Sequence, residues 1–460
     1  MQRAETLAMP DNLEDGWDDG GAVVDRCGDR FLHALSFLLM GYALFGHGVA
    51  YLGVPPIFVG ELLLGAGLLM LLRTHGWSAI FDMLPTVLLT LLVVWGGICT
   101  LPHISKYGAL AMRDAVVWGY ALWAIVVGGL VVARPQRLRL LIDNFRRFVP
   151  IFIVAAPILW VADNVLRDYI PRLPVSNARM LSVKAGDTLV HAAAIAAFFA
   201  VDLARNASLV SAMLLSLIVV LCGRSNRGGL LSFFVAFMVV NVFRPAHRWS
   251  MAVVGSLAFM LIMFVLVGAS ISIGQRRDIS ADQLLKNVTS VFGASQDSRL
   301  ENTKQWRLNW WGDIIGYTFD GEHFWMGKGF GVNLADDDGY QVRADGSLRS
   351  PHNVHMNFLA RSGVPGFALW VLLQLAWACS VGSALFRSIE ERQRTWSSLF
   401  IFLVAYWTAL MVNATFDVFL EGPMGGVWFW SVFGLGLAAV WIHREHPEVL
   451  DDLDAETDAE

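Results

Sequence analysis

The chain has few charged residues for its length. Only 16% of its 460 residues are charged and 56% are hydrophobic, whereas a soluble globular protein carries roughly a quarter charged residues. The apolar residues gather into runs of about 17–23 residues, the length that crosses a hydrocarbon core about 30 Å thick. A single buried core has no use for so many long runs. This composition argues against a soluble domain and predicts an all-α integral membrane protein.

Cysteine is scarce, and a basic segment is missing from the start of the chain. The four cysteines form no CxxC pair, which argues against zinc, iron–sulfur and redox motifs. The first thirty residues are acidic and contain no basic n-region, so no cleavable signal peptide is visible. The first hydrophobic run, from Phe31, is therefore expected to remain as a membrane helix.

The apolar runs, taken in order, predict about twelve membrane spans. They are centred in 31–49, 54–72, 79–99, 115–133, 148–166, 188–204, 207–222, 229–243, 250–271, 363–385, 396–416 and 423–442. Arginine is more frequent in one of the two alternating sets of short joints, so the positive-inside rule favours cytoplasmic termini. The expected parts are an acidic cytoplasmic tail (1–30), nine spans (31–271), a periplasmic loop domain (272–362), three spans (363–442) and a second acidic cytoplasmic tail (443–460).

The connection over 272–362 is much longer than a turn requires. A loop of about 90 residues between two spans is usually functional or disordered. This loop contains aromatic residues that can bury surface: Trp306, Trp310, Trp311, Phe319, Phe324, Trp325, Phe330 and Tyr340. We therefore expect a folded cap on the outer face.

A few ionisable residues lie within or next to the predicted spans: Glu61, Asp82, Asp163, His191, Asp202 and Asp417. Such groups are functional candidates. Several lie near predicted span ends, where water reaches them, and they do not form an obvious proton-relay ladder. This distribution weakens a transporter interpretation.

The joint between the seventh and eighth predicted spans, 224–229, contains Arg224 and Arg227 and ends in two glycines. Cations at membrane depth are costly, and a bound anion would offset that cost. Arginine suits phosphate because its planar fork donates two parallel hydrogen bonds. The glycines also permit close backbone approach at the start of a helix, where anions are favoured. Both arginines are therefore candidate phosphate ligands; the alternative is that they reach outer-leaflet headgroups.

The loop segment 298–311 contains Arg299, Arg307, Trp310 and Trp311. At helical spacing, Arg307 and Trp311 fall on one side, and Trp310 falls on an adjacent side. The pattern predicts an amphipathic helix at the membrane interface. In the functional interpretation, Arg307 reaches a lipid-borne phosphate and the tryptophans stack on sugar rings; the alternative is an interfacial anchor only.

The end of the loop contains His352, Asn353 and His355, just before the tenth predicted span. A histidine titrates near neutral pH, so His352 can accept a proton from a sugar hydroxyl. The His-x-x-His pair also hints at a metal, but a metal site needs a third ligand. Hydrogen bonding to the loop backbone is the remaining alternative.

These three blocks resemble the O-antigen ligase and polymerase superfamily of bacterial membrane glycosyltransferases. The family has a Ser-Arg-Gly-like element at an outer helix joint, which corresponds here to 224–229. It has an arginine one turn before a tryptophan, here Arg307 and Trp311, followed by a Gly-x-Gly turn, here within 327–331. A His-Asn pair and a Gly-x-x-Gly helix entry follow, here at 352–353 and 363–366.

The resemblance implies a metal-independent GT-C-like enzyme without a cofactor, in the bacterial inner membrane, with its active site facing the periplasm. Its donor would be an undecaprenyl-diphosphate-linked oligosaccharide. The diphosphate would be bound by one arginine of the 224–229 joint, Arg227 or Arg224, together with Arg307 and Arg299. Arg307 would also stabilise the leaving diphosphate. His352 would activate the acceptor hydroxyl, and direct displacement would invert the anomeric centre. Weaker sugar contacts would come from Trp310, Trp311 and Asn353.

The leading interpretation is a polymerase that joins lipid-linked repeat units of an O-antigen or exopolysaccharide. The related alternative is a ligase that moves the finished glycan to lipid A-core or another acceptor. A flippase or transporter and a non-catalytic assembly subunit are alternatives from other classes. The expected partners are the lipid bilayer, a chain-length regulator and a flippase, and no nucleic acid.

Overall fold

The computed structural model describes residues 15–204, 207–267, 271–272, 278–279 and 298–451. In chain order the elements are α1 (Asp15–Phe45), α2 (His47–Ala50), β1 (Gly53–Val54), β2 (Ile57–Phe58), α3 (Val59–Arg73), η1 (Trp77–Asp82), α4 (Leu84–Tyr107), α5 (Ala109–Gly119), α6 (Leu122–Ala133), α7 (Arg137–Val165), α8 (Ala185–Ala200), α9 (Leu209–Gly223), α10 (Arg227–Phe243), α11 (Arg248–Val267), β3 (Ile271–Ser272), β4 (Asp278–Ile279), α13 (Ser298–Phe319), α14 (Leu334–Asp337), α15 (Val354–Glu390), α16 (Arg394–Phe416), η2 (Phe419–Glu421), α17 (Pro423–Glu445) and η3 (Pro447–Leu450). The two short strand pairs, β1–β2 and β3–β4, are antiparallel. The predicted all-α class is confirmed.

Five of the described helices are long and apolar enough to cross a membrane: α4, α7, α15, α16 and α17. The pair α5 and α6, bent by 41° at a short break, makes a sixth if it is counted as one span. The helices α8 to α11 are apolar but shorter. The 16 residues of α8 rise only about 24 Å, less than a hydrocarbon core of about 30 Å. Among the described residues, the predicted count of about twelve spans is therefore not confirmed.

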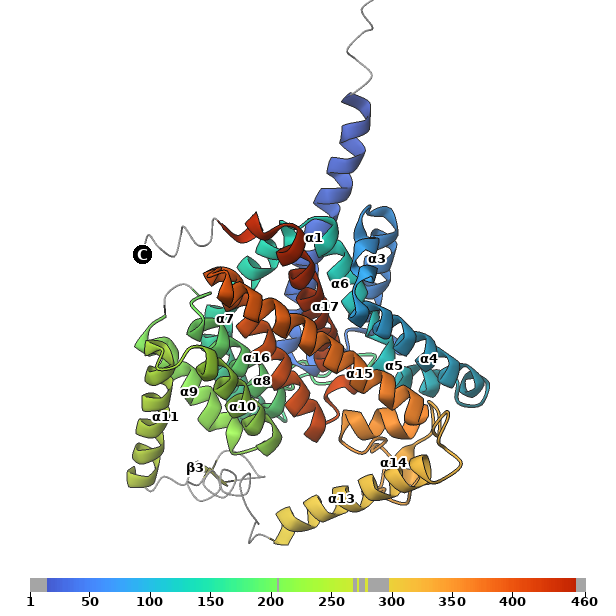
Figure 1. The fold of residues 1–460 in the computed structure, drawn as a ribbon. Coiled ribbons are helices and arrows are strands. Elements are labelled where there is room, and N and C mark those ends of the chain that lie inside the picture. Colours follow the sequence, from blue (N-terminus) through green and yellow to red (C-terminus); the bar gives the residue numbers. More distant parts are fainter. Residues whose placement is uncertain (1–14, 205–206, 268–270, 273–277, 280–297, 452–460) are drawn as a thin grey trace, which may run out of the picture.

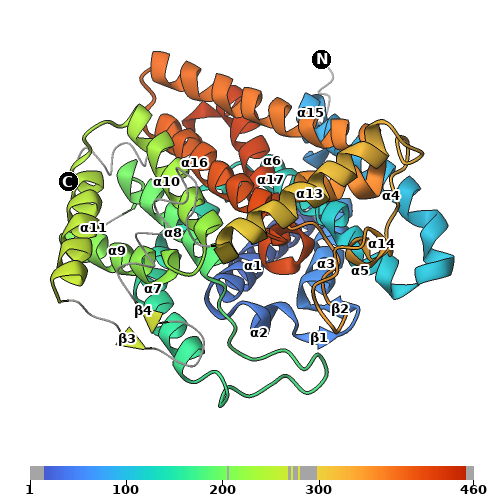
Figure 2. The ribbon, with the colours of Figure 1, turned by 90° about the horizontal axis from the view of Figure 1, so that it is seen from below.

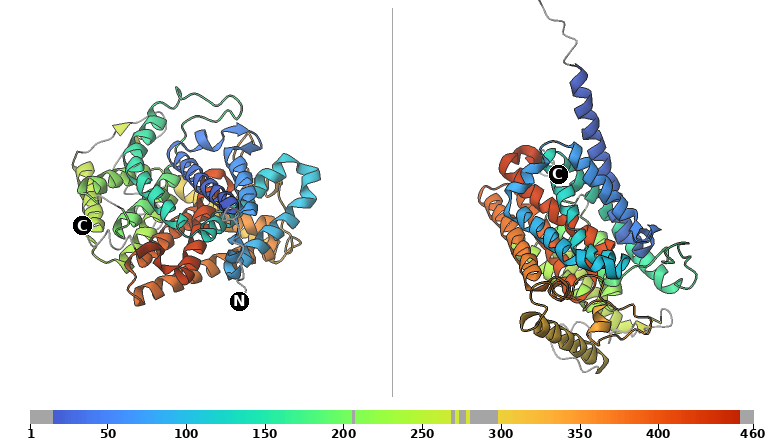
Figure 3. Two further views of the ribbon diagram at one scale, coloured as in Figure 1. Left: turned by 90° about the horizontal axis from the view of Figure 1, so that it is seen from above. Right: turned by 90° about the vertical axis from the view of Figure 1, so that its right-hand side faces the viewer.

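The helices form one bundle with two distinct ends (Figure 1). The first turns of α1 and the last turns of α17 lie at one end, which we call the termini end, as the side view in Figure 3 also shows. The opposite end, which we call the loop end, carries α13 and α14. In Figure 2, which looks at the loop end, α13 crosses in front of α16. Arg307 of α13 donates to the carbonyl of Phe416, the last residue of α16, at 2.9 Å.

The helix α17 lies at the centre of the bundle. In its most apolar window 83% of the residues are buried, against 33–61% in the other four long helices. Two indoles fix its position: Trp428 of α17 donates to the Leu39 carbonyl of α1, and Trp377 of α15 donates to the Phe433 carbonyl of α17, each at 2.9 Å. Buried indole N–H groups need such partners, so both rings add directional bonds to their apolar packing.

The described part of the long loop, residues 303–353, has a small core of its own. Trp310 and Ile314 of α13 pack with Leu334 of α14 and with Leu359 of α15, all nearly free of solvent contact. Trp310 stacks on Tyr340, with ring centroids 5.3 Å apart. These contacts fold the segment onto the start of α15, close to where the sequence places the tenth span.

The helix α15 is broken at Gly363, which divides a loop-end segment from the long membrane segment. Gly363 has φ 67° and ψ −173°, a conformation open essentially to glycine alone. Pro365 has no N–H to donate to the Arg361 carbonyl; the Gly329 N–H donates to it instead, at 3.1 Å. The Lys328 N–H bonds the Ala360 carbonyl at 2.7 Å. The loop thus satisfies backbone groups that the break would leave unpaired.

We expect Gly363→Ala to destabilise the protein strongly. A Cβ at this position would lie 2.4 Å from the Phe324 carbonyl oxygen, and the backbone strain adds to that clash. The loss in unfolding free energy should be about 3 kcal/mol or more, measured by thermal unfolding in detergent. Gly382→Ala is the matched control, because it lies in the same helix with nothing within 4 Å of an added Cβ. Equal melting temperatures for the two variants would contradict this account of the break.

Candidate active site

A pocket at the loop end is formed by four segments: the turn into α10, the first half of α13, the residue before the N-cap of α15, and the end of α16. It encloses about 510 Å³. We call it the loop-end pocket, and its lining residues are Ser225, Asn226, Arg227, Gly228, Leu231, Thr303, Lys304, Arg307, Leu308, Trp311, His352, Phe416 and Asp417. Side chains from all three sequence blocks therefore meet in one place.

The turn into α10 shows which of Arg224 and Arg227 lines the pocket, a choice that the sequence left open. Asn226 is the N-cap of α10, and its side-chain oxygen accepts from the Gly229 N–H at 2.8 Å. Arg227 is consequently the first helical residue and lines the pocket. Arg224 is 7% exposed, and its guanidinium carbon lies 5.1 Å from the Trp160 ring centroid, a cation–π contact outside the pocket lining.

The start of α10 adds to the positive charge of Arg227, because a helix N-terminus carries a partial positive charge. Gly228 lets this turn approach α16: a Cβ on it would lie 2.8 Å from the Cβ of Phe416. The first turn of α10 and the end of α16 therefore form one continuous wall of the pocket.

Arg307 enters the same pocket from α13. Its Nη1 donates to the Phe416 carbonyl at 2.9 Å, while its buried Nε has no partner among the described residues. Burial lowers the pKa of Arg307; the charge of Asp417 opposes that shift and the charge of Arg227 reinforces it. Three cationic side chains, Arg227, Lys304 and Arg307, thus share the pocket with one carboxylate, Asp417. The lining keeps an excess of positive charge, which a bound anion would offset.

His352 lines the same pocket, next to a carboxylate. Its Nδ1 is 3.8 Å from an Asp417 side-chain oxygen, an ion-pair distance rather than a hydrogen bond. Burial raises the pKa of Asp417, but the neighbouring His352 imidazole and the charge of Lys184 outweigh that effect and leave its pKa below the usual value. Asp417 therefore remains ionised at neutral pH.

The backbone on both sides of His352 is fixed by neighbouring groups. His352 itself has φ 53°, an uncommon conformation for a residue with a side chain. Trp311 donates from Nε1 to the Pro351 carbonyl at 3.0 Å. On the other side, Asn353 is the N-cap of α15 and accepts from the backbone N–H groups of His355 and Met356. These bonds hold the strained residue and direct its ring.

The other predicted site residues lie elsewhere. Trp310, fully buried, donates to Asp338 at 2.6 Å and does not line the pocket. Asn353 is also absent from the lining, and its side-chain oxygen is engaged in capping. Arg299 falls in the first turn of α13, where side chains lie outside the described residues.

The His-x-x-His pair does not converge on a metal position. His355 has both ring nitrogens engaged, with the Thr415 hydroxyl at 3.2 Å and the Trp370 indole N–H at 3.0 Å. Within the described part of the chain, no group of three histidine, cysteine, aspartate or glutamate residues has metal-binding geometry. Only His352 of the pair faces the loop-end pocket.

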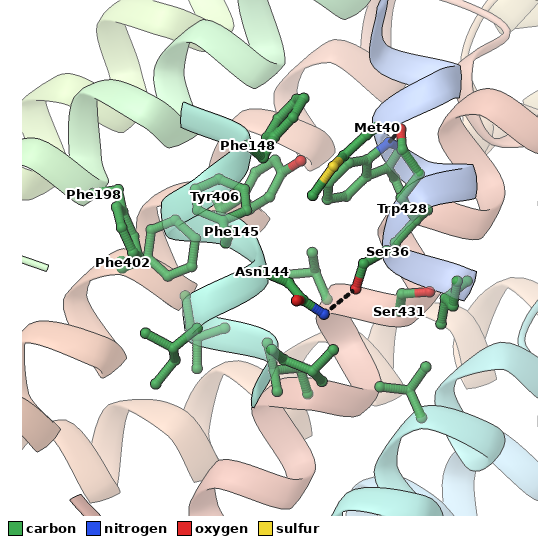
Figure 4. A pocket seen from close by; sticks show the side chains of 18 of the residues that line it. Ser36, Met40, Asn144, Phe145, Phe148, Phe198, Phe402, Tyr406, Trp428 and Ser431 are labelled. Carbon is green, nitrogen blue, oxygen red and sulfur yellow. Dashed lines mark hydrogen bonds between the residues drawn. The ribbon is translucent and has the colours of Figure 1, made fainter. Parts of the chain in front are cut away.

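The bundle interior holds a second cavity, shown in Figure 4, which is chemically unlike the loop-end pocket. Its walls are mainly apolar and aromatic, and of the described residues that line it none is charged. Asn144 donates to the Ser36 hydroxyl at 2.9 Å, and Tyr406 pairs with His191 at 2.8 Å. The Ser431 hydroxyl, also in the lining, has no partner among the described residues. Because its polar groups are uncharged, this cavity offers no charge to a phosphate.

A buried ion cluster behind the pocket positions the loop. Asp114 of α5, 7% exposed in its side chain, lies 2.8 Å from Arg349 and 3.2 Å from Arg361. The Gly331 N–H also donates to this carboxylate, at 3.2 Å. Arg361 in turn donates to the Arg349 backbone carbonyl at 3.2 Å. Since Arg349 directly precedes the Ser-Pro-His segment, the cluster fixes where His352 stands.

Two residues of the candidate site and its support were not singled out by the sequence motifs. Asp417 appears in the sequence only as an ionisable residue next to a span, and Asp114 has no local signal at all. Both act through partners far away in the chain; Asp114 and Arg349 are 235 positions apart. Only the fold brings them together.

Residues 180–371 match the model of a protein family described as O-antigen ligase. The matched range includes Arg227, Arg307 and His352, and it ends before Asp417. None of the curated proteins matches the chain at a significant level.

We expect Asp114→Asn to lower the unfolding free energy by about 3–5 kcal/mol, because removing one partner leaves buried arginine charge uncompensated. Asp337→Asn is the matched control. Asp337 is half-exposed, and its partner Lys328 keeps a second carboxylate, Asp338, so the control should change stability by no more than about 1 kcal/mol. Thermal unfolding in detergent compares the two, and a control as damaging as Asp114→Asn would contradict the positioning role.

Proposed function

Because the chain belongs, over residues 180–371, to the O-antigen ligase and polymerase superfamily, we propose that it is a polysaccharide polymerase. It transfers a glycan from an undecaprenyl-diphosphate-linked donor to an acceptor sugar hydroxyl in the loop-end pocket. The proposal rests on one observation: the same pocket is lined by Arg227, Arg307, His352 and Asp417. They combine two cations for a diphosphate with a histidine–carboxylate pair for a hydroxyl.

The diphosphate of the donor binds between α10 and α13. Arg227 contacts it together with the N-terminus of α10, and Arg307 contacts it from α13. A doubly charged anion relieves the repulsion between the two guanidinium groups. The same groups stabilise the negative charge that grows on the diphosphate as the glycosidic bond breaks.

His352 acts on the acceptor. Its ring nitrogen takes the hydroxyl proton while the acceptor oxygen bonds to the anomeric carbon and the bond from that carbon to the phosphate oxygen breaks. Asp417, ionised and 3.8 Å from Nδ1, orients the ring and stabilises the imidazolium that forms. Direct displacement inverts the anomeric centre, and the proton passes to solvent after transfer.

The active site faces the periplasm in this proposal. Arginines gather at the termini end, where the α6–α7 and α10–α11 joints lie; Arg134, Arg137, Arg244 and Arg248 are among them. The positive-inside rule then makes the termini end cytoplasmic and the loop end periplasmic. A lipid-linked donor held at the loop end would keep its polyprenyl chain in the bilayer beside Leu231 and Leu308.

A ligase is the second candidate, favoured by the description of the matching family. The bond-forming chemistry is the same, and the acceptor differs: a growing lipid-linked glycan for the polymerase, lipid A-core or another acceptor for the ligase. Products of purified enzyme separate the two. Donor alone yields a ladder of lengthened lipid-linked glycans from a polymerase and no product from a ligase.

We expect His352→Gln to lower the rate of glycan transfer by about 10²–10⁴-fold, the usual contribution of general-base catalysis. Transfer is measured with purified protein and lipid-linked donor. His323→Gln is the matched control, because His323 belongs to the same loop but lies outside the pocket lining. Full activity of His352→Gln in well-folded protein would remove the proposed mechanism.

A further inference from the structure

A groove lies at the termini end of the bundle, between α7 and α9. It encloses about 500 Å³, and we call it the termini-end groove. Its lining residues are Asp143, Arg146, Arg147, Val149, Pro150, Ile153, Val154, Phe199, Ala204, Ser208, Val210, Ser211 and Leu214. It shares no lining residue with the loop-end pocket, and no step of the proposed transfer uses it.

The charged part of the groove has two arginines and one aspartate, so it has a net positive charge. Arg146 is fixed, because its Nε donates to the Leu203 carbonyl at 2.8 Å and its Nη1 lies 3.0 Å from Asp143. Asp143 neutralises that arginine. Arg147 is exposed and has no hydrogen bond or ion pair to any described residue. The groove therefore presents one fixed and one available guanidinium side by side.

The rest of the groove is apolar and open to the surroundings. Pro150 and Val154 follow Arg147 along α7, and Val154 is 54% exposed. Facing them, Val210 of α9 is 65% exposed. From Arg147 to Val154 the helix rises about 10 Å, so the apolar walls run from the charged rim toward the middle of a long apolar helix.

We propose that the termini-end groove binds an anionic phospholipid, with its phosphate on Arg147 and Arg146 and an acyl chain along Val154 and Val210. Basic pockets between membrane helices suit anionic headgroups, and a guanidinium donates two parallel bonds to a phosphate. A zwitterionic lipid would bring a cation to a rim that is already positive, and a free phosphate would leave the apolar walls unused.

The test is a competition for the full-length protein in neutral detergent, read by native mass spectrometry. Phosphatidylglycerol and phosphatidylcholine with identical acyl chains are added in equal amounts. Wild-type protein should retain phosphatidylglycerol in preference by about fivefold, the effect of one basic residue near anionic lipid. Arg147→Gln should lose this preference, whereas Arg147→Lys, which keeps the charge, should retain most of it.

Arg73→Gln is the matched control, because Arg73 is an exposed arginine at the end of another helix and lines no groove described above. It should keep the wild-type preference. Equal retention of the two lipids by wild type, or an unchanged preference in Arg147→Gln, would overturn the proposal. Displacement of phosphatidylglycerol by an excess of soluble glycerol phosphate would also overturn it, since the apolar walls would then contribute nothing.

Discussion

The position of the long loop on the helix bundle depends on one buried carboxylate. Asp114 of α5 pairs with Arg349 at the end of the loop and with Arg361 in the first segment of α15. Burying this much charge is costly unless every group is paired, so the cluster admits one arrangement of loop and bundle. That arrangement brings His352 into the same pocket as Arg227 and Arg307.

The same electrostatic logic explains how the two ends of the bundle differ. At the loop end, two guanidinium groups and a helix N-terminus share a pocket with His352 and the ionised carboxylate of Asp417, which suits a reaction that creates negative charge. At the termini end, arginines border apolar walls and suit a lipid that remains bound. In the two proposals, positive charge at a membrane boundary serves transfer where a proton acceptor shares the pocket and lipid binding where apolar walls continue from it.

Sequence patterns anticipated the parts of the site that depend on neighbouring residues. Arg307 and Trp311 share a helical face, and His352 precedes a helix start, so local spacing was enough to select them. The choice between Arg224 and Arg227 required knowing that Asn226 caps α10. The sequence patterns did not select Asp417 and Asp114, because the residues that they contact are distant in the chain. The count of about twelve spans is not confirmed, because hydropathy finds apolar runs, whereas α8 to α10 are helices of at most 17 residues.

The central claim is that Arg227 and Arg307 together hold a polyprenyl diphosphate. The most direct measurement is the dissociation constant of undecaprenyl diphosphate and of undecaprenyl monophosphate for wild type, Arg307→Gln and, as control, Arg343→Gln in the exposed loop. We expect the diphosphate to bind more tightly than the monophosphate, and Arg307→Gln to weaken diphosphate binding about 10–100-fold while the control leaves it unchanged. Equal affinity for both lipids, or full affinity in Arg307→Gln, would contradict it.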